Sequence, residues 1–197
     1  MTRIQFVSLA LLIIFASVAD AKSKFTLSTM PMSADQIAVY KAFLISYSNG
    51  SNLSHINLAD TTVVLDATES DTNNCLNGIT VDDPEQLKSS IHKFTADVSL
   101  PSSFRLVDPS KQLKIIKKND PSRTISGGKP VKDAVETAFD AGILTLSEVA
   151  FDKRHEYAVL SFSFYCGQLC AHGETIVFQK QNGQWKRTNR TCRSWIS

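Results

Sequence analysis

Residues 157–181 have the sequence YAVLSFSFYCGQLCAHGETIVFQKQ, in which apolar and polar side chains alternate on both sides of a short cysteine loop. Alternation of this kind predicts half-buried β-strands, because successive side chains of a strand point to opposite faces. With Gly167 to Ala171 as the connecting loop, the two strands form an antiparallel hairpin. The apolar faces then meet in a register that places Cys166 opposite His172, Phe162 opposite Ile176 and Leu160 opposite Phe178.

Two more strands extend this hairpin into a meander. Asn182-Gly183 predicts a two-residue turn, because type I′ turns need positive φ at both central positions. The strand after the turn is expected from Gln184 to about Thr191, with Trp185 as its apolar anchor. Upstream, Leu144 to Phe151 is expected to form the first strand of the meander. Four strands make a sheet with an apolar face that another layer must cover.

Three amphipathic segments are candidates for that second layer. Ser33-Ala34-Asp35-Gln36 matches a capping box and predicts a helix that ends at Asn49-Gly50, residues that tolerate left-handed geometry. A second helix is predicted from Asp83, with one apolar stripe formed by Leu87, Ile91, Phe94 and Val98. Val131 to Ala141 is predicted to be a third helix, closed by Gly142.

The intervening segments predict short strands and loops. His55 to Leu65 is rich in β-branched residues and is expected to be a strand. Phe104 to Val107 and Leu113 to Lys117 are further strand candidates, the second the better of the two, and Thr68 to Asn77 is a polar loop. The predicted fold class is therefore α+β, with N-terminal helices packed on a C-terminal antiparallel β-meander. Cystatin- and NTF2-like cones have this general shape.

The N-terminus predicts export. Arg3 precedes an apolar run from Phe6 to Val18, and Ala19-Asp20-Ala21 matches a signal-peptidase site. We predict a signal peptide at residues 1–21, a flexible lead-in at 22–32 and a single domain at 33–197. Because the apolar run is shorter than a spanning helix needs, we expect no stable membrane span after cleavage. The expected location is periplasmic or extracellular.

The charge of the chain argues against some partners. The formal net charge is +2 at pH 7, a value too small to favour nucleic acid or an anionic membrane surface. The sequence after Glu174 nevertheless has no acidic residue and five basic ones: Lys180, Lys186, Arg187, Arg190 and Arg193. This segment could hold an anionic partner, or its charges could pair with acidic neighbours in the fold. Mixed-sign surfaces are common, which favours the second interpretation.

Several segments together resemble a family of uncharacterised exported bacterial proteins. In that family an LSxVxF strand leads to a CGxLC loop, then to an NGxW hairpin and a WIS end. The matching segments here are Tyr40–Leu44, Asp60–Thr62, Leu146–Phe151, Cys166–Cys170, Asn182–Lys186 and Ser194–Ser197. This chain departs from the family pattern at Ala171-His172, where relatives usually have glycine, and in its additional Cys75 and Cys192. The resemblance implies an exported β-meander domain, and no activity follows from it.

The four cysteines favour disulfides in an exported chain. We predict Cys166–Cys170 and Cys75–Cys192, because the short loop brings the first two together and the resembled family carries that pair. A bond from Cys192 to Cys166 or Cys170 is an open alternative, since the predicted register places Cys192 across from Gly173. A zinc site of Cys166, Cys170, His172 and Cys192 is less favoured, because the C-x₃-C spacing is loose for zinc. A thiol oxidoreductase would use C-x-x-C at a helix N-terminus.

A reaction is not indicated by any motif. Four residues near the meander resemble a general acid–base set, His172, Glu174, His155 and Glu156, but no nucleophile is placed beside them. We therefore assign no catalytic, cofactor-binding or metal-binding residue and no cofactor. The leading expectation is a non-catalytic binding or structural role in the cell envelope. The alternative is a pocket enzyme, a hydrolase or isomerase, whose site lies between the helices and the concave face of the sheet.

Overall fold

The computed structural model of this protein describes residues 26–28, 30–51, 53–65, 79–80, 90–95 and 98–197. Within these ranges one large sheet has the strand order β4-β2-β5-β7-β8-β9, and β6 pairs with β7. Its strands are β2 (Ile56–Ala59), β4 (Phe104–Val107), β5 (Ile143–Leu146), β6 (Ala150–Phe151), β7 (Tyr157–Gly167), β8 (Cys170–Gln181) and β9 (Gln184–Ile196). A separate parallel pair is formed by β1 (Thr26–Leu27) and β3 (Ser90–Ile91). The described helices are α1 (Ala34–Asn49), α3 (Pro109–Lys118), α4 (Pro121–Ser126) and α5 (Val131–Ala141).

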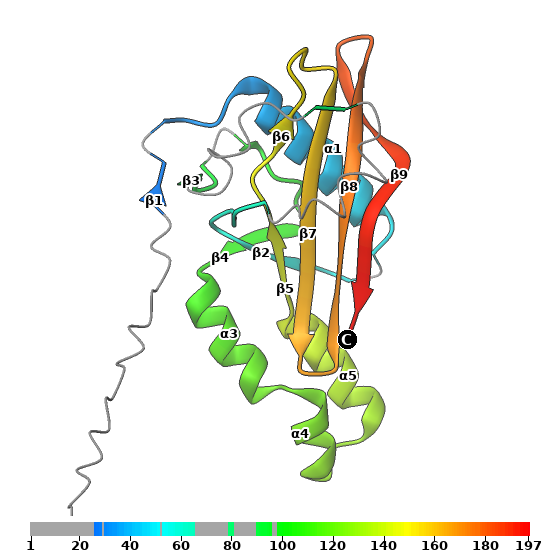
Figure 1. The fold of residues 1–197 in the computed structure, drawn as a ribbon. Helices are drawn as coiled ribbons and strands as arrows, with labels where there is room; N and C mark the ends of the chain where they lie inside the picture. Colours follow the sequence, from blue (N-terminus) through cyan, green and yellow to red (C-terminus); the bar gives the residue numbers. More distant parts are fainter. Residues whose placement is uncertain (1–25, 29, 52, 66–78, 81–89, 96–97) are drawn as a thin grey trace, which may run out of the picture.

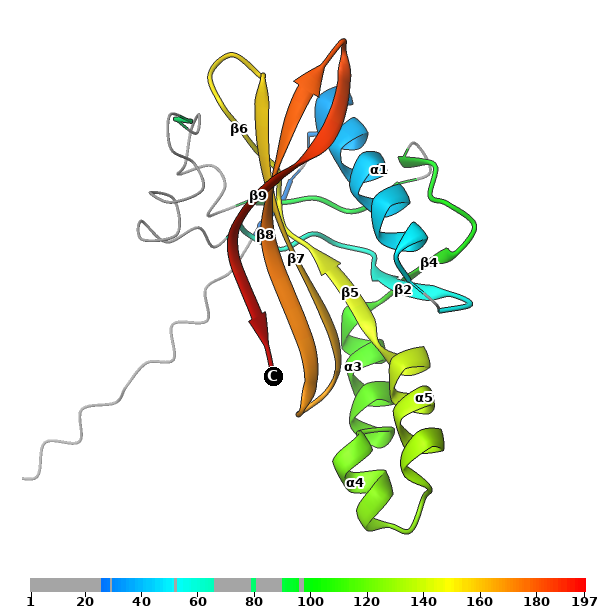
Figure 2. The ribbon, with the colours of Figure 1, turned by 90° about the vertical axis from the view of Figure 1, so that its right-hand side faces the viewer.

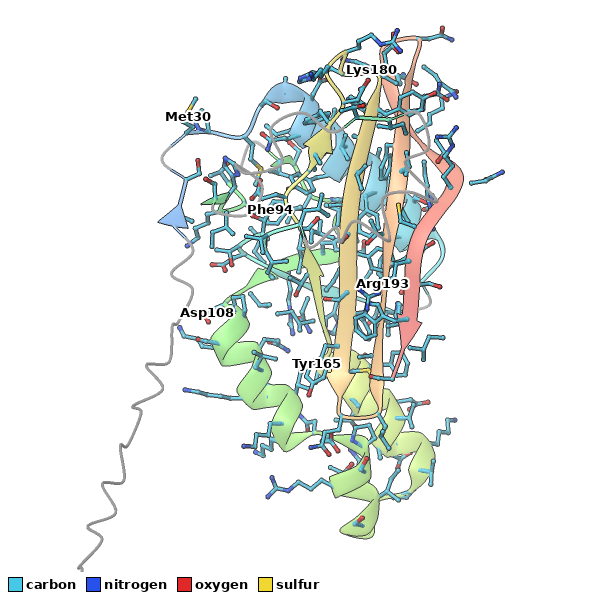
Figure 3. The ribbon with its side chains drawn as sticks, in the orientation of Figure 1. Met30, Phe94, Asp108, Tyr165, Lys180 and Arg193 are labelled. Carbon is cyan, nitrogen blue, oxygen red and sulfur yellow. A yellow bond between two sulfur atoms is a disulfide. The ribbon has the colours of Figure 1, made fainter. Side chains whose placement is uncertain are left out.

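The helices cover the sheet at two places, which confirms the α+β class. Helix α1 lies across one face of β7, β8 and β9, whereas α3, α4 and α5 gather beyond the end of β5 (Figures 1 and 2). Lys180 and Tyr165 mark the two opposite ends of the long strands (Figure 3). None of the helices in the described part of the chain is long and apolar enough to cross a membrane.

The main core lies between α1 and the sheet. Helix α1 buries Val39, Tyr40, Phe43 and Leu44, and β7 buries the predicted alternate set Ala158, Leu160, Phe162, Phe164 and Cys166 against them. Each large apolar side chain buried in this way stabilises the fold by about 1.5–3 kcal/mol. The capping box at the start of α1 is confirmed: the Ser33 hydroxyl accepts from the Gln36 N–H at 3.2 Å, and Gln36 Oε1 accepts from the Ser33 N–H at 2.7 Å. The helix ends at Gly50 with φ −93°, so the left-handed geometry allowed there is not used.

The predicted register of the β7–β8 hairpin is wrong by two residues. Phe162 lies opposite Glu174, Leu160 opposite Ile176, and Phe164 opposite His172. The reason is a tighter turn: Gly167 pairs with Cys170, and a β-bulge between Tyr165 and Gly167 absorbs the extra residue. A shift of two residues leaves every side chain on its predicted face, because side chains alternate with a period of two.

The last strand also differs from its prediction. It continues to Ile196 and not only to about Thr191, and Gly173 lies opposite Trp195 and not Cys192. Two bulges in the β8–β9 ladder shift its register, and the predicted position of Cys192 did not include them. The turn itself is confirmed, since Gln181 pairs with Gln184 and Asn182 and Gly183 have φ values of 51° and 77°.

Segments before residue 143 were predicted less well. Residues 90–91 form β3, so the helix predicted through Ile91 is wrong there; residues 83–89 lie outside the described part. Leu113 to Lys117 belongs to helix α3, capped by Asp108, and is not a strand. The weaker candidate, Phe104 to Val107, is β4. The parallel pairing of β2 with both β4 and β5 was not predicted, because parallel partners are far apart in the sequence.

The segment between the predicted signal peptide and α1 is partly ordered as a strand. Thr26–Leu27, within the predicted lead-in, pairs with β3. The start of α1 is tied to the far hairpin by Asp35, whose carboxylate accepts from Lys180 Nζ at 2.8 Å and from Trp185 Nε1 at 3.1 Å. Residues 1–25 and the loop expected at 68–77 lie outside the described residues, so those predictions stand untested.

Candidate functional site

The candidate site is a groove on the concave face of the sheet, between the end of α1 and the middle of α5. Its first part is a cavity of about 540 Å³. Side chains and backbone from α1, the turn after it, α5 and three strands line this cavity: Ser46, Tyr47, Gly50, Ser51, Leu53, Phe139, Phe162, Phe164, His172, Glu174 and Arg187. The groove therefore lies between α1, α5 and the sheet.

A second, more apolar cavity of about 390 Å³ continues the groove towards the cysteine turn. Both cavities are lined by Phe139, Phe164 and His172, so these three residues are the junction. The far part is lined by Pro121, Val135, Cys166, Leu169, Cys170, Ala171, Ile196 and Ser197. Leu169 and Ile196 are strongly exposed, at 78% and 88%. The first cavity thus has a mixed lining, and the second is more apolar.

An aromatic floor gives the junction its shape. The rings of Phe139 and Phe164 stack with centroids 5.8 Å apart, and Phe162 packs at 5.6 Å from Tyr47. Gly142, directly after α5, lets the Phe164 ring approach: a Cβ at this position would lie 2.8 Å from Phe164 Cε2 and collide with Cζ. Glycine at position 142 therefore allows the aromatic contact as well as the end of the helix.

The polar groups of the groove largely satisfy one another. Arg187 donates from Nη2 to Glu174 Oε2 at 2.8 Å, so one cation and one anion are paired at the polar end. Burial lowers the pKa of the His172 imidazole, which packs edge-on against Phe162, and Glu174 opposes this shift only in part. Burial also raises the pKa of Tyr47 to about 12, so its phenol stays protonated. At neutral pH the groove is lined by uncharged rings and one neutral ion pair.

The structure joins Cys166 to Cys170 in a disulfide with Cα atoms 5.1 Å apart, which confirms that predicted pair and uses both thiols proposed for zinc or redox chemistry. Cys192 is also disulfide-bonded. Cys75 lies outside the described residues, so the Cys75–Cys192 pair stays a prediction. Among the residues that the structure describes, no three His, Cys, Asp or Glu side chains are grouped to hold a metal.

The four residues of the predicted acid–base set do not come together. His172 and Glu174 line the same cavity, because residues two apart on a strand point to the same face. His155 lies by Asp35 and stacks on Phe151 at 4.8 Å, and Glu156 contacts Arg154. The basic C-terminal segment also divides: Lys180 pairs with Asp35, Arg187 with Glu174, and Arg190 lies over the ring of Tyr157.

Sequence reasoning missed part of the groove and one buried cluster. Phe139 lies in the helix predicted at 131–141, but its role was not predicted: it is 39% exposed and lines both cavities. Glu148 is 3% exposed and bonds to Thr62 and His92 on a distant segment. The signal for Glu148 was available: it is a charged residue inside the apolar run Leu146–Phe151, and buried charges need partners.

Comparisons with protein-family models, with curated proteins and with solved structures gave no match. The likeness to the exported bacterial family therefore stays a prediction, and the functional argument depends on the geometry of this chain.

Proposed function

We propose that this protein is an exported binding domain that holds an amphiphile with one linear apolar chain in the groove between α1, α5 and the sheet. The apolar chain lies along Phe139, Phe164 and the far cavity, and the polar head lies at the end with Arg187 and Glu174. The proposal rests on one observation above all: two neighbouring cavities share Phe139, Phe164 and His172, and the second of them is the more apolar.

The shape of the groove favours a chain over a compact ligand. The cavities share three lining residues and differ in all the others, so a ligand that occupies both must extend from one compartment into the next. Ligand sites in proteins are typically apolar with a few placed polar groups, and this groove has both parts. The polar end offers Arg187 and the hydroxyls of Ser46 and Ser51 to a headgroup.

Export is part of the proposal. The Cys166–Cys170 disulfide is consistent with an oxidising compartment, and the signal peptide predicted at residues 1–21 would deliver the chain there. A role in the cell envelope follows, because amphiphiles with acyl chains are the material of that layer. N-terminal sequencing of the exported protein should give Lys22 as the first residue.

The binding experiment uses a fluorescent long-chain fatty acid titrated into the purified protein. Phe139→Asp places a carboxylate at the junction of the two cavities and should weaken binding by at least about tenfold, since an unpaired charge against an apolar chain costs more than 1.4 kcal/mol. The matched control is Val131→Asp on the same helix, where Val131 is 61% exposed and lines neither cavity. Equal affinity of the two variants would contradict the proposal.

A second candidate, a hydrolase or isomerase acting in the same groove, has one observation in its favour. His172 is a neutral imidazole beside Glu174 in a pocket, and such a group can accept a proton at neutral pH. This candidate predicts that the protein turns over short-chain aryl esters or an isomerisable substrate. His172→Gln should abolish that turnover. Binding without turnover favours the first proposal.

A further inference from the structure

A second site lies away from the groove, at the buried carboxylate of Glu148 between β5 and β6. Glu148 accepts hydrogen bonds from the Thr62 hydroxyl, from the His92 backbone N–H at 2.8 Å, and from His92 Nδ1 at 2.9 Å. The phenol of Tyr40 is fully buried next to this cluster and donates to the Ser147 carbonyl at 2.9 Å. Glu148 is therefore held by fixed donors from a segment more than fifty residues away in the chain.

The bond to Glu148 fixes the orientation of the His92 ring. A neutral imidazole that donates from Nδ1 carries its lone pair on Nε2, on the opposite side of the ring. His92 also lines a cavity of about 280 Å³ between β1, β3 and the start of α1. A carboxylate that holds one histidine nitrogen while the other stays available is the usual arrangement behind a metal-binding histidine.

Two methionine side chains also line this cavity. The chain has three methionines, and the two that follow the predicted signal peptide, Met30 and Met32, both line this cavity with His92. Met32 packs against the core, but Met30 is 71% exposed and points away from the body of the protein in Figure 3. Core packing does not account for an exposed methionine. Its unbranched side chain can turn back over the cavity with little loss of packing.

We infer that this cavity binds a soft monovalent cation, Cu(I), through Nε2 of His92 and the thioether sulfurs of Met30 and Met32. Thioethers select Cu(I) over the harder divalent ions, and imidazole also binds copper well. Glu148 acts as a positioning residue, because it sets the tautomer and the angle of His92 without touching the metal. Lys93 also lines this cavity, and its ammonium is paired with Asp60 at 3.3 Å.

The test uses Ag(I), which has the charge and softness of Cu(I) and needs no reductant that could open the disulfides. The full-length protein carries methionine labelled with ¹³C at the ε-methyl group, and the signals of Met30 and Met32 are assigned from the single Leu variants. Both signals and the ring signals of His92 should shift and saturate at one equivalent of Ag(I). Met30→Leu/Met32→Leu keeps the apolar volume and should lower the Ag(I) affinity by at least about tenfold.

Two comparisons separate this site from adventitious binding. His155→Gln alters an exposed histidine outside the cavity and should leave Ag(I) binding unchanged. Glu148→Gln keeps an acceptor near His92 and should weaken binding roughly ten- to a hundredfold, as outer-shell partners typically do. Methyl signals that do not move, or equal affinity of the double Leu variant and the native protein, would overturn the inference.

Discussion

Phe139 of α5 stacks on Phe164 of β7, with ring centroids 5.8 Å apart, and this contact lies where the two cavities of the groove meet. The stack is shared by both cavities of the groove and is open to solvent on one side. If the two rings served only to stabilise the fold, they would contribute more when fully covered by protein, since stabilisation grows with the apolar area removed from water. Its exposure therefore supports a ligand that covers it.

Phe162→Ala should be strongly destabilising. The Phe162 ring lies 5.0 Å from Phe43 and 5.6 Å from Tyr47, between α1 and the sheet. Removing a buried ring typically lowers the free energy of unfolding by about 3–5 kcal/mol. Urea denaturation measures this directly. A loss below about 1 kcal/mol would show that Phe162 is not part of the core that holds α1 on the sheet.

Replacing both Cys166 and Cys170 by serine should have a smaller effect. The bond closes a ring of about five residues, so its loop-entropy contribution is on the order of 2 kcal/mol. The turn keeps another restraint, because the Asp120 carboxylate accepts from the Gln168 N–H at 2.8 Å. The melting temperature should fall by several degrees. A melting temperature as low as that of Phe162→Ala would mean that the disulfide, and not the core, determines the stability of the hairpin.

The C-terminal half of the fold could be predicted from sequence because its contacts are local. Strand alternation and the Asn182-Gly183 turn each depend on a few neighbouring residues, and both are confirmed. The capping box at Ser33, in the N-terminal part of the chain, is confirmed for the same reason. The register slipped by two because the bulge before Gly167 leaves no mark in the alternation. Leu113 to Lys117 was misassigned since its apolar residues suit a short strand as well as an amphipathic helix.

The candidate sites were harder to predict, because they join residues from distant segments. The His92–Glu148 pair and the Phe139–Phe164 stack bring together elements that share no motif. The sequence did place Glu174 and His172 on one face, and the structure confirms that both line the groove. The end of α1 and α5 cover this part of the sheet through tertiary packing, which hydrophobic periodicity does not predict.

The stability of the protein should depend on His172 below neutral pH. Burial lowers the pKa of His172 below the value of 6.5 expected in the unfolded chain, so the unfolded chain takes up the proton first as pH falls. Native protein should therefore lose stability relative to His172→Gln as pH falls from about 7 through 6.5 to the folded pKa, and no further below it. Urea midpoints of the two proteins across this range measure the difference. A difference that is independent of pH would contradict the buried imidazole.

Glu148→Ala should destabilise more than Glu148→Gln. Alanine leaves the His92 Nδ1–H without an acceptor, whereas the Thr62 hydroxyl and the His92 backbone N–H each keep a partner in the other segment. A buried donor left unsatisfied typically costs about 1–3 kcal/mol. Glutamine keeps one acceptor oxygen in place, so its loss should be smaller. Chemical denaturation of both variants provides the measurement, and equal losses would show that the hydrogen bonds to Glu148 contribute little.

The groove is tested most directly by the ring signals of the four histidines during titration with dodecanoate, followed by ¹H–¹³C correlation spectra. His172 lines both cavities, whereas His55, His92 and His155 line neither. Binding in the groove predicts a saturable shift of the His172 ring signals that Phe139→Asp abolishes, with the other three histidines unmoved. An unchanged His172, or shifts of similar size at all four histidines, would contradict an amphiphile-binding groove.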